Sequence, residues 1–204
     1  MLTYLNRGKL PVKNIQRSGN GIITILMILT SLMVIFIFSM GHVSAESSIV
    51  YVNDTGGNDS WNGLNSTWQD GTLNGPKKSI KNATAIVTDG GTVNIANGIY
   101  NGTGNTNITI DKNIFIIGES SDNTIIDGNN IAGIFLIQNG VNVTIWNLTI
   151  VNGNSTQNVT FENENVTSGG AIFNAGNLTV LNCTFIGNTA SWGGAIGNTG
   201  NVTV

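Results

Sequence analysis

Cationic side chains are scarce in this chain of 204 residues, and nearly all of its charge after the first 45 residues is negative. Both arginines and the one histidine lie before residue 46, and four lysines then stand against eleven Asp and Glu, a net charge of −7. Proteins bind the phosphates of nucleic acids through clustered Lys and Arg. The sequence therefore predicts no nucleic-acid partner.

Cysteine is present once, as Cys183, so the chain can form no internal disulfide. A single thiol does not build a thiolate metal site, and without histidine no Ser or Cys has an imidazole partner for nucleophilic catalysis. Cys183 is therefore interpreted as a small interior hydrophobic residue. The scarcity of these residues favours a protein that has no enzymatic activity in this segment.

Residues 1–45 have the composition of an export signal. Four basic residues at positions 7–17 precede an uncharged apolar run at residues 21–40, and small residues follow up to Ala45. We expect a signal peptide that is cleaved between Ala45 and Glu46. The run is also long enough to span a bilayer, so an uncleaved N-terminal membrane anchor is the alternative, with membrane contact only through residues 21–40.

Beyond residue 45, Asn, Thr and Gly alternate with β-branched and other apolar residues, which is typical of strands with one buried face. One motif occurs four times, as Asn107-Ile-Thr-Ile, Asn142-Val-Thr-Ile, Asn177-Leu-Thr-Val and Asn201-Val-Thr-Val. Gly-Gly-Ala-Ile occurs at 169 and again at 193, with the same step as the one from Asn177 to Asn201. Two independent motifs with the same step indicate a structural repeat.

Each repeat is predicted to be a short strand, a bend and another short strand. The bends fall at Asn147 and Asn182, because Asn tolerates the left-handed backbone region. The motif at Asn107 aligns with the later copies after one extra residue near Lys112. The residues expected to face inward are Val143, Ile145, Leu148, Ile150, Leu178, Val180, Cys183 and Phe185.

A unit of about 24 residues has no room for the helix that joins parallel strands in an open sheet. The predicted fold is therefore all-β, a right-handed parallel β-helix, or solenoid, in which each turn pairs with the turns above and below. The longer steps, from Asn107 to Asn142 and from Asn142 to Asn177, allow two explanations. Either one turn carries a loop insertion, or extra strands at residues 124–126 and 134–137 intervene.

Residues 46–100 differ from the repeats and are expected to form an N-terminal cap. Pro76 and the helical spacing of Ile80, Ala83 or Thr84, and Val87 predict a short helix that covers the apolar end of the coil. Residues 101–204 are the predicted repeats. Because residue 204 lies inside a repeat motif, we expect the sequence to be truncated at its C-terminus.

The chain resembles the pectin-lyase-like right-handed β-helix superfamily, and in particular the adhesin-like surface proteins of methanogenic archaea. The resemblance rests on Gly57-Asn-Asp-Ser-Trp-Asn-Gly63, Gly75-Pro-Lys-Lys-Ser-Ile80 and Gly90-Gly-Thr-Val-Asn-Ile95 in the cap. The Gly-Gly-Ala-Ile copies, with Phe185-Ile-Gly-Asn188 between them, are similar to the repeat of bacterial polymorphic outer-membrane proteins. This fold hosts lyases, hydrolases, adhesins and structural fibres, so the resemblance is more specific for fold than for function.

The enzymatic members of the superfamily use an Arg or Lys base with Ca²⁺, or clustered Asp. The resemblance therefore implies no lyase chemistry in residues 46–204, which lack Arg and have no Lys beyond Lys112. Hydrolysis needs two carboxylates about 5 to 10 Å apart across one groove. The paired acids in the sequence are Asp54 with Asp59, Asp122 with Asp127, and Glu162 with Glu164. We interpret the last pair as part of a solvated polar loop inserted at residues 157–167.

The oxygen-rich loop at residues 53–62 is a candidate for Ca²⁺, but it lacks the spacing of an EF-hand, and turn formation alone explains its composition. No other metal or cofactor is expected. In the same region Trp61 and Trp68 are predicted to pack under the loop rather than to form a sugar platform.

Asn-x-Ser/Thr sequons are the most abundant motif, with fourteen copies. They are open to two interpretations, surface N-glycosylation or simply the strand repeat. The candidate asparagines are Asn53, Asn58, Asn65, Asn82, Asn101, Asn107, Asn142, Asn147, Asn154, Asn158, Asn165, Asn177, Asn182 and Asn201.

These observations favour an adhesin-like or envelope structural protein, secreted or held at the cell surface, whose partners are surface polysaccharides or other cell-surface components. Two alternatives stay open. One is the N-terminal part of a β-helix enzyme, pectate-lyase-like or a glycoside hydrolase, with catalytic residues beyond residue 204. The other is a membrane-tethered glycan-binding module.

Overall fold

The structure, a computed structural model, describes residues 47–155, 158–161 and 164–204. The predicted cleavage site at Ala45 and Glu46 and the apolar run at 21–40 lie outside the described residues. In the part of the chain that is described, no helix is both long and apolar enough to cross a bilayer.

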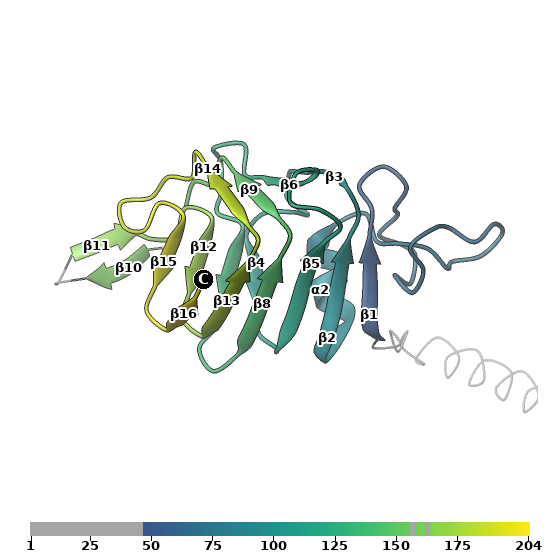
Figure 1. The fold of residues 1–204 in the computed structure, drawn as a ribbon, viewed down its shortest axis with the longest axis horizontal. Coiled ribbons are helices and arrows are strands. Elements are labelled where there is room, and N and C mark those ends of the chain that lie inside the picture. The colour runs from purple at the N-terminus through teal and green to yellow at the C-terminus, as the bar shows by residue number, and fades with distance from the viewer. Residues whose placement is uncertain (1–46, 156–157, 162–163) are drawn as a thin grey trace, which may run out of the picture. The chain divides into compact units, whose positions relative to one another are not determined.

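Most strands of the described chain belong to three parallel sheets (Figure 1). Sheet A contains, in spatial order, β1 (Ser47–Val52), β2 (Val87–Ile95), β5 (Ile114–Gly118), β8 (Asn142–Trp146), β13 (Asn177–Leu181) and β16 (Asn201–Thr203). Sheet B contains β3 (Gly98–Tyr100), β6 (Thr124–Asp127), β9 (Thr149–Val151) and β14 (Thr184–Ile186). Sheet C contains β4 (Ile108–Ile110), β7 (Phe135–Ile137), β12 (Ile172–Asn174) and β15 (Ile196–Asn198). The predicted all-β fold with parallel strands is confirmed.

The chain passes through the three sheets in a fixed order. From β2 onward, apart from two strands between β9 and β12, the strands fall in sheets A, B and C in turn. One passage through the three sheets is called here a round, and the strands of successive rounds pair with one another. Val143 pairs with Leu178, and Ile172 pairs with Ile196, as the two repeat motifs predict. Figure 1 shows the result as a row of sheet A strands that runs from β1 to β16.

The prediction for the first copy of the Asn motif is wrong. Ile108 opens β4 in sheet C and pairs with Phe135, so Asn107 is not the counterpart of Asn142. The counterpart is Asn113, because the residue after it, Ile114, pairs with Val143. Strands of sheets A and C have the same alternation of apolar and polar residues, and a period of two cannot assign a strand to one sheet.

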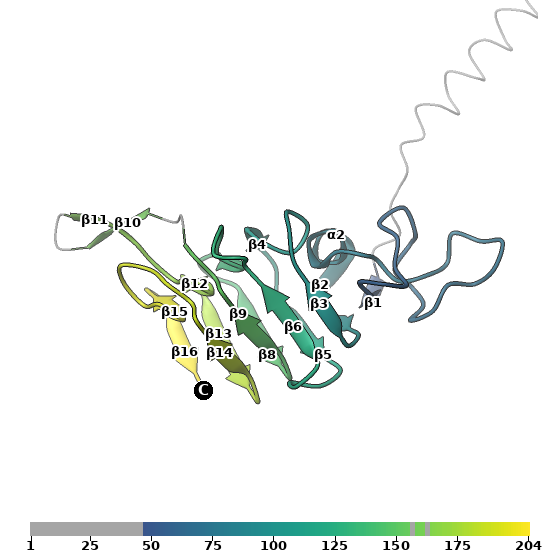
Figure 2. The ribbon, with the colours of Figure 1, turned by 90° about the horizontal axis from the view of Figure 1, so that it is seen from above.

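The longer steps have different causes. The strands expected at residues 124–126 and 134–137 are present as β6 and β7, but they are the ordinary sheet B and sheet C strands of a round, as β14 and β15 are between 177 and 201. The step from 107 to 142 is long because Asn107 precedes a strand of sheet C rather than of sheet A. Between 142 and 177 the chain instead carries an insertion, an antiparallel hairpin of β10 (Asn158–Phe161) and β11 (Glu164–Thr167). The interpretation of 157–167 as a polar loop is therefore corrected for the described residues, which pair as two strands. Figure 2 shows the hairpin projecting from the round between β9 and β12.

The core lies between the three sheets and follows the predicted alternation. Val143, Ile145, Leu148, Ile150, Leu178 and Val180 are buried, as expected. Cys183 and Phe185 are partly buried and pack against this core. Burying a side chain the size of Ile or Leu stabilises the fold by about 1.5–3 kcal/mol, so the stacked inward residues are the main source of stability.

The Gly-Gly-Ala-Ile motif provides a tight bend before two strands of sheet C, β12 and β15. Gly169 and Gly193 have φ values of +71° and +64°, which favour glycine. The second glycine is needed for close approach, because a Cβ on Gly170 would lie 1.9 Å from the carbonyl oxygen of Gly194. The motif therefore sets both the direction of the bend and the distance between rounds.

The bends after β8 and β13 are made by Asn147 and Asn182, whose φ values of 58° and 47° lie in the left-handed region, as predicted. Nδ2 of Asn182 donates to Oδ1 of Asn147 at 2.7 Å. The two bends therefore stack directly on one another.

The predicted helix is present as α2 (Ile80–Ile86), with Ile80, Ala83 and Thr84 buried. It begins after Pro76 rather than at it, because Lys77 forms a parallel bridge with Val52 of β1 and extends the chain to the N-cap, Ser79. The helix contacts β1, β2 and β4.

Candidate functional site

The outer face of sheet A carries exposed apolar side chains in register on neighbouring strands. Strand pairing aligns one column of outward residues, here called the aromatic column: Tyr51, Asn94, Ile117, Trp146 and Leu181. Trp146 and Leu181 are each 45% exposed. Neighbouring strands lie about 4.8 Å apart, so the column forms a continuous strip across the sheet.

A second outward column lies two residues earlier along each strand. It is called here the threonine column and consists of Ile49, Thr92, Phe115, Thr144, Thr179 and Thr203. Phe115 is 45% exposed and lies diagonally opposite Trp146 on the next strand. Faces of parallel sheets are normally covered, so exposed aromatic rings on such a face mark a candidate binding surface.

A third outward column, the asparagine ladder, begins at Asp89 and continues through Asn113, Asn142, Asn177 and Asn201. Oδ1 of Asp89 accepts from Nδ2 of Asn113 at 2.9 Å. Each later Nδ2 donates to Oδ1 of the preceding Asn at 2.8–2.9 Å. The ladder gives this side of the face a fixed, polar edge.

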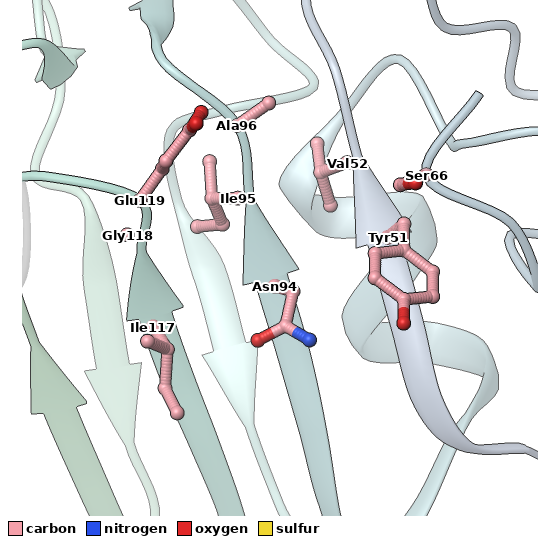
Figure 3. A pocket seen from close by; sticks show the side chains of 9 residues that line it. All are labelled: Tyr51, Val52, Ser66, Asn94, Ile95, Ala96, Ile117, Gly118 and Glu119. Carbon is pink, nitrogen blue, oxygen red and sulfur yellow. The ribbon is translucent and has the colours of Figure 1, made fainter.

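A pocket of about 310 Å³ lies where the aromatic column meets the loop that follows β1. Figure 3 shows the side chains of Tyr51, Asn94 and Ile117 side by side on three neighbouring strands, with Ser66 of the loop beyond Tyr51. The full lining is Tyr51, Val52, Ser66, Asn94, Ile95, Ala96, Ile117, Gly118 and Glu119. The volume is within the range of small-ligand sites, which are apolar with a few polar groups.

Glu119 is the one charged residue among those that line the pocket in the described chain. Its Oε2 accepts from the backbone N–H of Asn97 at 2.9 Å, which fixes the carboxylate at the rim. The remaining polar groups of the lining are the hydroxyls of Tyr51 and Ser66 and the amide of Asn94. This chemistry suits a neutral ligand with hydroxyl groups and disfavours an anion.

The paired acids named from the sequence serve local structure where their contacts are defined. Oδ1 of Asp59 accepts from the backbone N–H groups of Lys78 and Ser79 at 3.0 and 2.9 Å, and Nζ of Lys77 donates to the Asp59 carbonyl at 2.9 Å. Burial lowers the pKa of Lys77, against the nearby charge of Asp59, which raises it. The Asp59 carboxylate therefore holds the chain that leads into α2.

The other two pairs do not come together as a described catalytic site. Oδ1 of Asp127 accepts from the backbone N–H of Asn129 at 2.8 Å and from Nδ2 of Asn152 at 3.1 Å, while Asp122 is exposed in the turn before β6. Glu162 lies outside the described residues, and Glu164 is the first residue of β11. Among the described residues, no three His, Cys, Asp or Glu are grouped closely enough to hold a metal ion.

Trp61 and Trp68 stack in parallel, with ring centroids 5.7 Å apart and an interplanar angle of 5°. Trp61 also lies against Gly75, where a Cβ would be 2.4 Å from the ring. Nε1 of Trp68 donates to the carbonyl of Thr72 at 3.1 Å. The pair therefore orders the loop, as predicted for Trp61, while Trp68 remains 47% exposed.

The sequon asparagines differ in what their side-chain nitrogen does. In six of them Nδ2 donates to another protein group, and these are Asn82, Asn142, Asn154, Asn177, Asn182 and Asn201. Asn53, Asn58 and Asn147 accept hydrogen bonds through Oδ1. Asn101, Asn107 and Asn158 are exposed, Asn65 is half-buried, and Asn165 lies in β11.

Sequence reasoning missed the outer face of sheet A. The signal was present, because Ile114-Phe-Ile-Ile117 and Ile145-Trp146 are apolar at consecutive positions and so place apolar side chains on both faces of a strand. The repeat motifs indicate only the alternate residues that face the core, such as Val143 and Ile145.

Comparison of the chain with protein-family models, with curated proteins and with solved structures gives no match.

Proposed function

We propose that residues 46–204 form a right-handed parallel β-helix, with α2 as part of its N-terminal cap. The proposal is supported by the repeated order of sheets A, B and C and by pairing between successive rounds. Crossovers between parallel strands of one sheet are almost always right-handed, which gives the hand. Ile80 of α2 belongs to the same core as the inward residues Val50 and Val93, as a cap requires.

On this fold, the protein acts as an exported, adhesin-like or envelope protein whose outer face of sheet A binds a surface polysaccharide. The observation that carries this proposal is the exposed pair of Phe115 and Trp146 on the sheet face that also carries the asparagine ladder and Thr144, Thr179 and Thr203. Aromatic rings pack against the C–H faces of sugars, while Asn and Thr side chains bond to their hydroxyls. A polysaccharide lying across β8, β13 and β16 meets the same Asn and Thr side chains on each strand.

The ligand is a neutral polysaccharide rather than a polymer of uronic acids. Glu119 stands at the rim of the pocket, and the charge of residues 46–204 is −7, with four lysines against eleven acids. A polyanion would meet repulsion both over long range and at the pocket.

This proposal assigns no catalytic residue to the segment. Hydrolysis of a glycosidic bond uses two carboxylates, and the described lining of the pocket supplies Glu119 alone. The face is therefore a binding surface, and the protein's location in the envelope makes that binding useful for attachment.

The test is a binding survey of the purified full-length chain against immobilised neutral and uronic-acid polysaccharides, followed by titration calorimetry. Trp146→Ala and Phe115→Ala are each expected to weaken binding about tenfold, which corresponds to about 1.4 kcal/mol. Ile186→Ala is the matched control, since Ile186 is an exposed apolar residue (57%) in sheet B. Its affinity should equal that of the parent protein.

Three results would overturn the proposal. They are the absence of binding to every neutral polysaccharide, equal affinities for all three variants, and a preference for uronic-acid polymers. Release of new reducing ends or unsaturated products during incubation would establish the enzyme alternative in its place.

A further inference from the structure

We propose that N-glycans are attached to the folded protein at Asn58 and Asn101 and are excluded from the sequon asparagines that stack between rounds, Asn142, Asn177, Asn182 and Asn201. The inference rests on the export that forms part of the proposed function, but not on polysaccharide binding. All of these sites have the same Asn-x-Ser/Thr motif, and they differ in whether Nδ2 is hydrogen-bonded to a neighbouring round.

The chemistry makes Nδ2 the deciding atom. In N-glycosylation, Nδ2 bonds to the anomeric carbon of a sugar supplied as a lipid-linked phosphate ester. The bond from that carbon to the phosphate oxygen breaks, the lipid-linked phosphate leaves with the bonding electrons, and Nδ2 loses one proton. The acceptor must therefore present Nδ2 to solvent, together with the hydroxyl group two residues further on.

In the stacked asparagines, Nδ2 is already used inside the fold. It donates from Asn142 to Asn113 at 2.9 Å, from Asn177 to Asn142 at 2.9 Å, and from Asn201 to Asn177 at 2.8 Å. Nδ2 of Asn182 donates to Asn147 at 2.7 Å in the second stack. Glycosylation leaves Nδ2 one N–H group, so a sugar on any of these atoms would have to take the position that the bond between rounds does not occupy and would have to fit beside a neighbour about 4.8 Å away.

The hydroxyl group closes two further sequons. Oγ1 of Thr149, in the sequon of Asn147, donates to the carbonyl of Ser121 at 2.6 Å. In the sequon of Asn82, Thr84 is buried and its hydroxyl donates to Lys81 at 3.0 Å, while Nδ2 of Asn82 donates to Ser79 at 2.8 Å. In the Asn147 sequon the hydroxyl group is therefore hydrogen-bonded within the fold, and in the Asn82 sequon both the hydroxyl group and Nδ2 are.

The sequons at Asn58 and Asn101 have the opposite geometry. All three residues of Asn58-Asp-Ser60 and all three of Asn101-Gly-Thr103 are exposed. Oδ1 of Asn58 accepts from the backbone N–H of Ser60 at 2.9 Å, so this bond orders the amide through its oxygen and does not use Nδ2. Neither triplet lies in a strand, so neither takes part in pairing between rounds.

Both open sequons lie next to the start of α2. Asp59, beside Asn58, holds the N–H of Ser79, and Gly104, close to Asn101, accepts from the N–H of Lys81 at 3.0 Å. The helix packs on the core through Ile80, whereas the aromatic column projects from the other face of β1 and β2. Glycans on the asparagine ladder would stand on the outer face of sheet A, whereas Asn58 and Asn101 lie outside the strands of that sheet.

The experiment is site-by-site mapping of glycan occupancy by mass spectrometry. The full-length chain is produced through a secretory pathway that carries out N-glycosylation and is recovered from the medium or envelope. Asn58 and Asn101 are expected to be occupied and the four stacked asparagines unmodified. Ser60→Ala and Thr103→Ala should each remove the mass of one glycan, while Thr144→Ala and Thr179→Ala, the matched controls in sheet A, should leave the mass of the attached glycans unchanged.

Substantial occupancy at any of the four stacked asparagines would overturn the inference, and so would empty Asn58 and Asn101 in exported protein. Polysaccharide binding is measured separately, so the two proposals can fail independently. A protein that binds polysaccharide but carries glycans on its ladder would refute this inference alone, and a correctly modified protein that binds no polysaccharide would refute only the proposed ligand.

Discussion

The side-chain amide of Asn177 donates to Oδ1 of Asn142 at 2.9 Å, and the backbones of the same two residues pair in β13 and β8. An Asn side chain can both donate and accept, so each one extends the ladder in both directions. A carboxylate only accepts, and Asp89 accordingly stands at the start of the ladder. The long stretch of chain that separates Asn142 from Asn177 is thus closed by side-chain and backbone pairing at once.

Asn142→Ala should cost more stability than Asn201→Ala. The first change removes two ladder bonds and the second removes one within the described chain. At a net contribution of about 0.5–1.5 kcal/mol per bond, with exposed bonds at the low end, we expect losses of about 1–2 and about 0.5–1 kcal/mol. Urea unfolding measures both, and equal losses would show that the ladder does not stabilise the fold.

At Asn147, replacement by Ala should be worse than replacement by Gly. Both variants lose the bond from Asn182, but at a φ of 58° Ala also carries the penalty of the left-handed region, about 1–2 kcal/mol. At Asn142, which lies in a strand, the order should reverse, with Gly worse by about 0.5–1 kcal/mol. The same order at both positions would contradict the assigned bend.

Adjacent residues of β5 should respond differently to truncation. Ile116 is fully buried, so Ile116→Ala is expected to cost about 2–5 kcal/mol through lost burial and a cavity. Phe115 points outward and is 45% exposed, so Phe115→Ala should change stability by about 0.5 kcal/mol or less while weakening ligand binding. Chemical denaturation of the two variants checks the assignment, which fails if Phe115→Ala is the more damaging change.

Stability should fall at high pH through Tyr100. Burial raises the pKa of its hydroxyl, as do the charges of Asp54 and Glu119, and the hydroxyl donates to the carbonyl of Ala96 at 2.8 Å. In the unfolded chain a tyrosine ionises near pH 10, so above that pH the unfolded state loses a proton that the folded state keeps. The stabilisation from this group is therefore complete below about pH 10 and is lost progressively above it.

Tyr100→Phe tests this pH dependence, since it removes the ionisable group but keeps the ring. Near neutral pH the variant should be less stable by about 0.5–1.5 kcal/mol, the net value of a hydrogen bond. Between pH 9 and about pH 11 its unfolding free energy should decline less steeply than that of the parent protein. Identical slopes in the two proteins would exclude Tyr100 as the source.

Gly170→Ala should disrupt the bend before β12. The added Cβ would lie 1.9 Å from the Gly194 carbonyl oxygen, a backbone atom, and overpacking of this kind costs about 1–3 kcal/mol. Gly133 is the control, because it precedes β7 at the position that Gly170 has before β12. A Cβ on Gly133 would be 3.5 Å from its nearest neighbour. Thermal unfolding should show Gly133→Ala to be as stable as the parent, and a comparable loss in both variants would refute the close-approach argument.

The sequence predicted those features that depend on neighbouring residues in the chain. Alternation identified the inward residues such as Ile145, and the tolerance of Asn for left-handed backbone located the bends at Asn147 and Asn182. The recurrence of Gly-Gly-Ala-Ile gave the register of Ile172 with Ile196 correctly.

Features that depend on which rounds become neighbours were not predictable in the same way. Asn107 was wrongly aligned with Asn142 of sheet A. Ile108 and Ile114 both begin strands in which apolar and polar residues alternate, and only the pairing between rounds shows that the first lies in sheet C and the second in sheet A. The exposed outer face of sheet A was missed for a related reason. Phe115 and Trp146 belong to successive rounds and are far apart in the chain, and their proximity arises from strand register alone.

The β10–β11 hairpin shows that chain length can change at one point without consequences elsewhere. It accounts for the greater length of the step from Asn142 to Asn177 compared with the step from Asn177 to Asn201, yet both steps keep every rung of sheet A in register. The segment between Ser155 and Ser168 is therefore expected to tolerate inserted sequence. A tag, an epitope or a second recognition loop grafted there would be displayed at the side of the protein, and evolution has the same freedom to vary this point while the rest of the chain is held constant.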